Sequence, residues 1–321
     1  MNVRYQRFFL YLAISAVVCF VSASGAHAAS SGQQSGQSGD AGTRHSWFGF
    51  DGTLLGGAVS GQWIVAEELA EKDIYSHFQI QKGQACTVYS PGGLAGEATV
   101  SFFRPNQERI DGSFLSSYEV QLENGRTLGF GSARLAVKCD WNPIPRQPVA
   151  MATNNAAYAK ILQKYLAQNG LPNATPNIVQ LFKVDLEGDG VDEIVICAQN
   201  IVAGNPGAFS WEPGKALVAG GIGIPSGSLK GNYSLLLLRK IVNGQVCEIP
   251  LGKFIALKNA TPADTEQISP PLFKVYQFAD LNGDGKMEIL VGEDYYESIS
   301  YSAYEIQGNK AVRVLTTGMG F

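Results

Sequence analysis

A ten-residue acidic segment occurs twice in this chain of 321 residues, at Asp185–Ile194 and again at Asp280–Ile289. Both copies read Asp-Leu-x-Gly-Asp-Gly-x-x-Glu-Ile, and their first residues lie 95 positions apart (280 − 185). Oxygen-bearing side chains occupy positions one, three, five and nine, and glycines let the backbone curl between them. Oxygen ligands at alternate positions of a tight loop suit a hard cation such as calcium. The duplication therefore predicts a metal and a repeated architecture.

Residues 1–28 have the form of a signal peptide. Arg4 and Arg7 precede a short apolar stretch, Phe8–Val21, and Ala26-His27-Ala28 supplies the small-x-small pattern that signal peptidase reads. The apolar stretch is too short to span a bilayer, which needs roughly 20 residues, and no later run approaches that length. We therefore expect an exported protein, periplasmic or extracellular, with no transmembrane segment.

The mature chain is acidic and keeps an even number of cysteines. The formal net charge of −4 includes both arginines of the signal peptide, so their removal leaves −6. There is no basic stripe, and nucleic acid is not an expected partner. Four cysteines remain after Cys19 is removed, which in an exported chain indicates disulfides. We predict Cys86–Cys139 and Cys197–Cys247, because each pair falls within one expected domain; buried free thiols are the alternative.

Turn and strand signals divide the mature chain into two domains. Residues 29–44 are mostly Ser, Gly and Gln and are expected to be a flexible leader. Residues 45–145 are expected to form a β-rich N-terminal domain, with a candidate short helix at Ala66–Lys72 and a boundary at the prolines of 142–145. The expected strands of this domain are Ala85–Tyr89, Ala98–Phe103, Ser116–Leu122 and Arg134–Val137.

Residues 150–321 are expected to form a C-terminal domain that begins with one helix. Its apolar positions are spaced as on a single helical face, Asn154 or Asn155 can cap its start, and Gly170 and Pro172 end it. The apolar face consists of Tyr158, Ile161, Leu162, Tyr165 and Leu166.

The rest of this domain divides into two similar units, at about 178–249 and 273–315. Each has the order strand, acidic loop, strand, long connection, strand, tight turn, strand, which is typical of a four-stranded antiparallel blade. The predicted fold is mainly β with one clear α-helix. Since a propeller needs about four or more blades, two blade-like repeats predict a partial or divergent propeller.

The flanks of the loops decide which class of calcium loop they can be. An EF-hand needs a bidentate Glu at position twelve and helices on both sides, whereas these loops have Ile196 and Val291 there, with β-type flanks. The loops instead resemble the calcium loops of FG-GAP and VCBS-type repeats, the class found in integrin-like β-propellers. The resemblance covers the loops and their flanking strands, and not the N-terminal domain.

The resemblance implies a ligand set for Ca²⁺. In that class the side chains at positions one, three, five and nine coordinate calcium together with the backbone carbonyl of position seven. In the first loop the ligands would be Asp185, Glu187, Asp189, the Val191 carbonyl and Glu193. In the second loop they would be Asp280, Asn282, Asp284, the Lys286 carbonyl and Glu288.

The loops also depart from the family pattern. Position nine is usually Asp and here is Glu in both copies, Glu187 replaces the usual Asp or Asn at position three, and the Phe-Gly half of the motif is missing. The additional methylene of Glu187 leads us to expect a weaker first site, although the charge of Asp192 could reverse that order. The alternative is a metal-free turn held by Asx hydrogen bonds and glycine.

No catalytic motif stands out. The mature chain has two histidines, His45 and His77, without a companion motif for a serine hydrolase or enough nitrogen ligands for a histidine zinc site. Paired carboxylates could serve a glycosidase, and one acidic and aromatic cluster follows the second loop. That cluster consists of Glu293, Asp294 and Glu297 with Tyr295 and Tyr296.

The expected role is therefore binding. We interpret the chain as an exported calcium-binding module for an unknown protein or glycan ligand. One alternative is a secreted glycan or cell-wall hydrolase with paired carboxylates, and another is a domain in which calcium only holds the fold. The Gly-rich insertion between Asn200 and Asn232 is a possible binding loop.

Overall fold

The computed structural model describes residues 45–108, 114–201, 229–259, 270–295 and 298–320. The signal peptide and leader predicted at 1–44, most of the Gly-rich insertion, and Tyr296 and Glu297 of the acidic cluster lie outside these ranges. The described part is mainly β, as predicted, and all its paired strands are antiparallel. No helix of the described part is long and apolar enough to cross a membrane.

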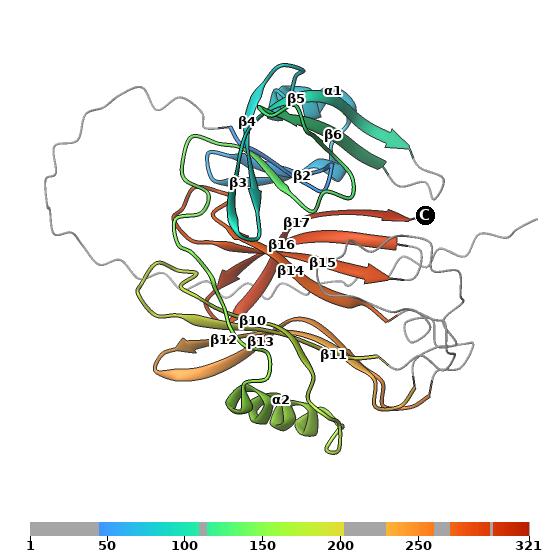
Figure 1. The fold of residues 1–321 in the computed structure, drawn as a ribbon, viewed down its shortest axis with the longest axis vertical. Coiled ribbons are helices and arrows are strands. Elements are labelled where there is room, and N and C mark those ends of the chain that lie inside the picture. The colour runs from blue at the N-terminus through green and yellow to red at the C-terminus, as the bar shows by residue number, and fades with distance from the viewer. Residues whose placement is uncertain (1–44, 109–113, 202–228, 260–269, 296–297, 321) are drawn as a thin grey trace, which may run out of the picture. The chain divides into compact units, whose positions relative to one another are not determined.

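The N-terminal strands close into a barrel (Figure 1). Its sheet has the order β3-β2-β1-β8-β4-β5-β6-β7, and β2 also pairs with β6 through Thr53 and Ser117. Six strands thus form a closed ring around an apolar interior that includes Trp47, Val88 and Val100. The elements are β1 (Trp47–Phe50), β2 (Thr53–Val59), β3 (Gln62–Val65), η1 (Ala66–Glu68), α1 (Glu71–Phe78), β4 (Ala85–Ser90), β5 (Gly93–Glu108), β6 (Phe114–Leu122), β7 (Thr127–Leu128) and β8 (Leu135–Lys138).

The short helix expected at Ala66–Lys72 has different limits in the structure. The segment forms a 3₁₀ turn, η1, and an α-helix, α1, that starts later and runs to Phe78. Between them Leu69 and Ala70 are extended, with ψ of 142° and 155°. The helical segment is therefore interrupted where the prediction made it continuous.

The C-terminal strands form two separate sheets. One has the order β13-β12-β11-β10-β9 and the other β14-β15-β16-β17, so each repeat is a four-stranded antiparallel meander. The elements of the first are β9 (Val149–Ala150), α2 (Ala156–Gln168), β10 (Ile178–Val184), β11 (Glu193–Asn200), β12 (Tyr233–Val242) and β13 (Gln245–Ile255). Those of the second are β14 (Leu272–Ala279), β15 (Glu288–Tyr295), β16 (Ser298–Gln307) and β17 (Lys310–Gly320).

The predicted helix is α2, and it begins as expected at Asn155. The Asn155 side chain accepts a hydrogen bond from the Ala157 N–H at 3.0 Å, and Gly170 follows the helix with φ of +91°. Leu162 and Leu166 are fully buried against the sheet of β10–β13. Figure 1 shows α2 lying along that sheet.

Both C-terminal sheets are covered on both faces. One apolar cluster lies between them and includes Val195, Leu236 and Ile289. The opposite face of the first sheet packs on α2, and the opposite face of the second packs on the barrel, for example Tyr276 against Phe50. Because helix and barrel cover the outer faces, two blade-like sheets bury their apolar residues without a closed ring of blades.

The four described cysteines are free thiols in this structure. Cys86 lies in the barrel interior, whereas Cys139 packs on the other side of the sheet. Cys197 pairs with β12 on one side and Cys247 pairs with β12 on the other. Strands two apart are separated by about 10 Å, whereas a disulfide needs Cα atoms within about 7 Å, so Cys197–Cys247 would require the backbone to move. Cys86–Cys139 would require it as well, because these two side chains point to opposite faces of one sheet.

Candidate metal centre

The two acidic loops have the same conformation. The first joins β10 to β11 and the second joins β14 to β15. Asp185 and Asp280, at position one, each accept N–H groups from the glycines at positions four and six. The distances to position four are 2.6 Å and 2.7 Å, and those to position six are 3.1 Å and 2.9 Å. All four glycines have φ between +74° and +85°, a region that favours glycine. The repeated sequence thus specifies a repeated turn.

The glutamate at position nine of each loop accepts a hydrogen bond from the backbone N–H of position two. Glu193 accepts the Leu186 N–H at 2.8 Å, and Glu288 accepts the Leu281 N–H at 2.7 Å. Both side chains are buried, 2% and 1% exposed. Burial raises the pKa of both carboxyls, against the lowering effect of these N–H groups, and raises that of Glu288 well above 4.5.

Glu288 has one oxygen that no protein group satisfies. Its Oε1 is buried without a hydrogen-bond partner. Burial is the largest cause of the raised pKa of Glu288, and the like charges of the neighbouring Asp284 and Asp280 raise it further. A buried carboxylate oxygen without a donor costs about 1–3 kcal/mol or more, and a bound cation would remove that cost. Among the described residues, no oxygen of the first loop is left unpartnered in this way.

In the first loop, a carboxylate pairs with a lysine side chain from β12. The Lys240 ammonium lies 2.6 Å from Glu187 Oε2, and the lysine is 5% exposed. Lys240 also lowers the pKa of Glu193, after the larger effects of burial and of the Leu186 N–H. Asp192, which the sequence offered as an additional charge for this loop, instead pairs with Lys183 at 2.8 Å on the surface. The carboxylates of the first loop thus have protein partners.

A single arginine connects the two loops. Arg146 Nε donates to the Asp185 carbonyl at 2.6 Å, and its Nη2 donates to the carbonyls of Leu186 and Gly285 at 2.9 Å and 2.8 Å. The Met287 N–H also donates to the Leu186 carbonyl at 2.8 Å. Segments 95 positions apart in the sequence are therefore held side by side.

Trp141 packs against the second loop. Its indole N–H donates to the Asp280 carbonyl at 2.8 Å, and its ring lies 3.2 Å from where a Cβ on Gly283 would be. A small hollow of about 240 Å³ between this loop and the turn after β2 is lined by Trp141, Asn282 and Asp284 among others. The second loop is consequently half-buried under an aromatic ring.

The predicted ligands lie in two turns, but they are not gathered around a point. Within the described residues, no three His, Cys, Asp or Glu side chains converge closely enough to form a metal cluster. Their carboxylates instead accept loop N–H groups, as in the metal-free turn alternative. Each carboxylate oxygen has a second lone pair and can still bind a cation. The second loop fits calcium because the buried Oε1 of Glu288 has no protein partner that a cation would have to displace. Among the described residues, the first loop has no such oxygen.

The described acids of the cluster after the second loop, Glu293 and Asp294, do not face each other across a cleft. Glu293 and Asp294 are consecutive on β15, so their side chains point to opposite faces of the sheet. Glu293 accepts the hydroxyls of Tyr295 at 2.8 Å and Tyr304 at 3.2 Å. Asp294 is 2% exposed, and burial raises its pKa to about 7. Neither residue lines the two pockets described here.

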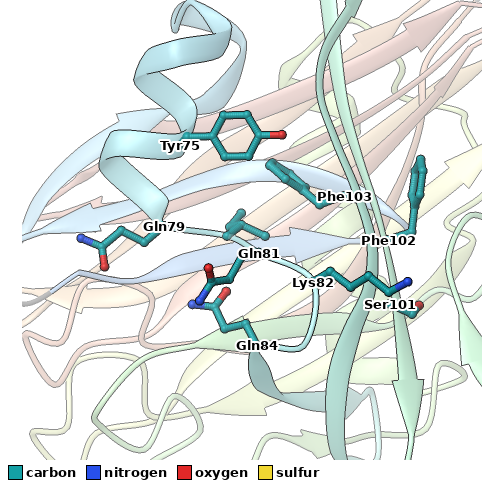
Figure 2. Close-up of a pocket in the computed structure, with 9 residues that line it drawn as sticks. Tyr75, Gln79, Gln81, Lys82, Gln84, Ser101, Phe102 and Phe103 are labelled. Atoms are coloured by element: carbon teal, nitrogen blue, oxygen red, sulfur yellow. The ribbon is translucent and has the colours of Figure 1, made fainter.

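A larger pocket lies on the barrel between α1 and β5, and Figure 2 shows its lining. Its volume is about 790 Å³. Tyr75 and Phe102 are 45% and 44% exposed, and Phe103 packs edge-on to Tyr75 at 5.7 Å between ring centroids. A bulge at Ser101 shifts the alternation of β5 and turns Phe102 outward. The other polar side chains of the lining are the amides of Gln79, Gln81 and Gln84, the Lys82 ammonium and the Ser101 hydroxyl, and the lining has no carboxylate.

Comparisons with family models, curated proteins and solved structures found no match to this chain. The resemblance to FG-GAP and VCBS-type loops therefore stays a prediction.

Sequence reasoning missed the residues that contact the loops from distant parts of the chain. Lys240 and Arg146 belong to no motif, and Trp141 precedes the proline segment that was interpreted only as a boundary. Aligning the third strand of each repeat would have pointed to Lys240. The unequal connections before those strands conceal that alignment in the sequence.

Proposed function

We propose that this chain is an exported calcium-binding protein that acts as a binding module, with calcium in a loop of the FG-GAP or VCBS type. The observation that carries the proposal is the buried, unpartnered Oε1 of Glu288 at the base of the second loop. Asp280, Asn282, Asp284 and the Lys286 carbonyl would complete the ligand set with Glu288. A bound calcium would supply the positive charge that these carboxylates lack.

A calorimetric calcium titration of chelator-treated protein tests this proposal. We expect binding in the range of extracellular modules, with Kd of about 10⁻⁴ to 10⁻³ M. Asp280→Ala removes the position-one carboxylate and should abolish the binding heat of the second loop. If the wild-type protein gives no binding heat, and its Tm is the same in chelator and in calcium, the proposal is wrong.

For the ligand surface we propose the pocket between α1 and β5, and a glycan as its occupant. The exposed faces of Tyr75 and Phe102 can stack on the apolar face of a sugar ring. The amides of Gln79 and Gln81 offer both donors and acceptors to hydroxyl groups, and Gln84, whose Oε1 accepts the Trp47 indole N–H at 3.2 Å, offers its NH₂ group. The lining has no carboxylate pair, which favours binding over hydrolysis.

Titration with soluble oligosaccharides compares two phenylalanine variants. Phe102→Ala removes an exposed ring of the pocket, whereas Phe130→Ala removes a 61% exposed ring outside it. We expect at least a tenfold loss of affinity for Phe102→Ala and no change for Phe130→Ala. Equal affinities of the two variants, or no oligosaccharide binding by the wild type, would exclude a glycan at this pocket and leave a protein ligand as the alternative.

A further inference from the structure

The two repeats place opposite charges at one equivalent position. Ile194, which follows position nine of the first loop, pairs with Arg239, and Ile289 of the second loop pairs with Tyr304. The next residue along the third strand lies beside position nine. That residue is Lys240 in the first repeat and Glu305 in the second.

Lys240 is held inside the first repeat. It is 5% exposed, and its ammonium lies 2.6 Å from Glu187, a distance typical of a charge-assisted hydrogen bond. A buried lysine needs a negative partner, because an unpaired buried charge is costly. The longer side chain of Glu187 supplies that partner, where the family pattern has Asp or Asn. The substitution at position three and the lysine on β12 therefore belong together.

Glu305 adds negative charge beside the second loop. Its Oε2 accepts the indole N–H of Trp63 at 3.1 Å, which fixes the carboxylate on the barrel side. The second loop thus combines the unpartnered Oε1 of Glu288 with an additional acidic neighbour. Nothing comparable to the Lys240 ammonium lies against its carboxylates among the described salt bridges.

We propose that the first loop carries its own cation, the Lys240 ammonium, and that the second loop is the single calcium site of the described chain. This inference rests on the proposed calcium binding. A divalent ion in the first loop would lie against the ammonium that already neutralises Glu187. In the second loop Arg146 bonds only the Gly285 carbonyl, and no ammonium or guanidinium pairs with a ligand carboxylate among the described salt bridges.

Binding stoichiometry tests the inference, measured by calorimetry and by native mass spectrometry of the full mature chain with calcium alone. We expect one calcium per wild-type molecule and two for Lys240→Gln, with the new site abolished by adding Asp185→Ala. Lys183→Gln is the matched control: it removes the same charge from the exposed pair with Asp192, so its stoichiometry should stay at one.

The reverse exchange covers the case in which Lys240→Gln does not fold. Glu305→Lys places an ammonium at the equivalent position of the second repeat and should reduce the stoichiometry to zero. Glu305→Gln can keep the acceptor for Trp63 and should only weaken binding. Circular dichroism of each variant shows whether its fold is intact.

The outcomes separate the two proposals. A wild-type stoichiometry of zero contradicts calcium binding itself. A stoichiometry of two, loss of the wild-type calcium in Asp185→Ala, or unchanged binding in a folded Glu305→Lys variant overturns the role of Lys240 while calcium binding stands. A folded Lys240→Gln variant that still binds one calcium overturns it as well.

Discussion

Replacing Glu288 by glutamine should have opposite effects on stability in chelator and in calcium. Glu288 is 1% exposed, with one oxygen bound to the Leu281 N–H and the other unpartnered. Glutamine has nearly the same shape and no charge. In chelator the variant should therefore be more stable than the wild type, by about 1 kcal/mol or more, because an unpartnered buried charge costs more than an unpartnered amide.

Calcium should reverse that order. At a Kd of about 10⁻⁴ to 10⁻³ M, calcium at about 10 mM stabilises the wild type by about 1.4 to 2.7 kcal/mol through mass action. For a chain of this size each kcal/mol raises Tm by about 2 °C or more. Glu288→Gln lacks a charged ligand, so its Tm should barely respond.

Thermal unfolding of both proteins at several pH values provides the measurement. Burial raises the folded-state pKa of Glu288 above its ordinary value of 4.5. The protonated form is therefore favoured by folding, and the stability of the wild type in chelator should fall as pH rises above about 4.5. Glu288→Gln has no such group, and its stability should fall less over the same range.

Glu193→Gln is the matched control in the first loop. It changes the equivalent glutamate, which is also buried but lies near Lys240. This variant should keep the full response to calcium, because the carboxylate that it removes belongs to the first loop. If Glu288→Gln responds to calcium as strongly as the wild type does, the reasoning about the unpartnered oxygen is refuted.

Four other variants or treatments give separate predictions. Arg146→Ala removes the three hydrogen bonds that Arg146 donates to carbonyls of the two loops, so we expect about 1–3 kcal/mol lower stability by urea unfolding; a change within error would contradict it. The pKa of Asp294 is raised to about 7 by burial, so wild-type stability should fall as pH rises from about 4 to 7, by about 4 kcal/mol at most, and Asp294→Asn should lack this fall. Terbium bound in the second loop should show emission sensitised by Trp141, and Trp141→Phe should lose most of it while calcium still binds. Burial raises the pKa of the Cys86 and Cys197 thiols to about 12, so alkylation of folded protein followed by peptide mapping should leave both unmodified, whereas recovered cystine peptides would show the predicted disulfides.

The sequence alone determined the local structure of both repeats. β10 (Ile178–Val184) and β12 (Tyr233–Val242) lie within the unit predicted at about 178–249, and α2 begins after the predicted cap. The loop conformation was predictable because the hydrogen bonds within each loop join residues at most seven positions apart. Bonds of that range depend on the order of residues and on glycine, so a short segment specifies them.

Other features of the N-terminal region could not be derived in this way. Closure of the barrel depends on the β2–β6 pairing, which joins Thr53 to Ser117. The cysteine pairing was predicted from domain membership, whereas the register places Cys86 and Cys139 on opposite sides of one sheet. The register of strand pairing decides which face of the sheet each side chain occupies, and amino-acid composition does not determine that register.

The difference between the two loops was decided only by the tertiary structure. Lys240 follows Glu193 by 47 positions (240 − 193), whereas Glu305 follows Glu288 by 17 (305 − 288). Equivalent places in the two repeats are thus reached through connections of different length. Strand pairing brings each third strand beside its loop, and packing excludes the water that would otherwise screen the charges. The sequence determined where oxygen ligands could lie, and the fold determined that Lys240 lies beside the first loop and Glu305 beside the second.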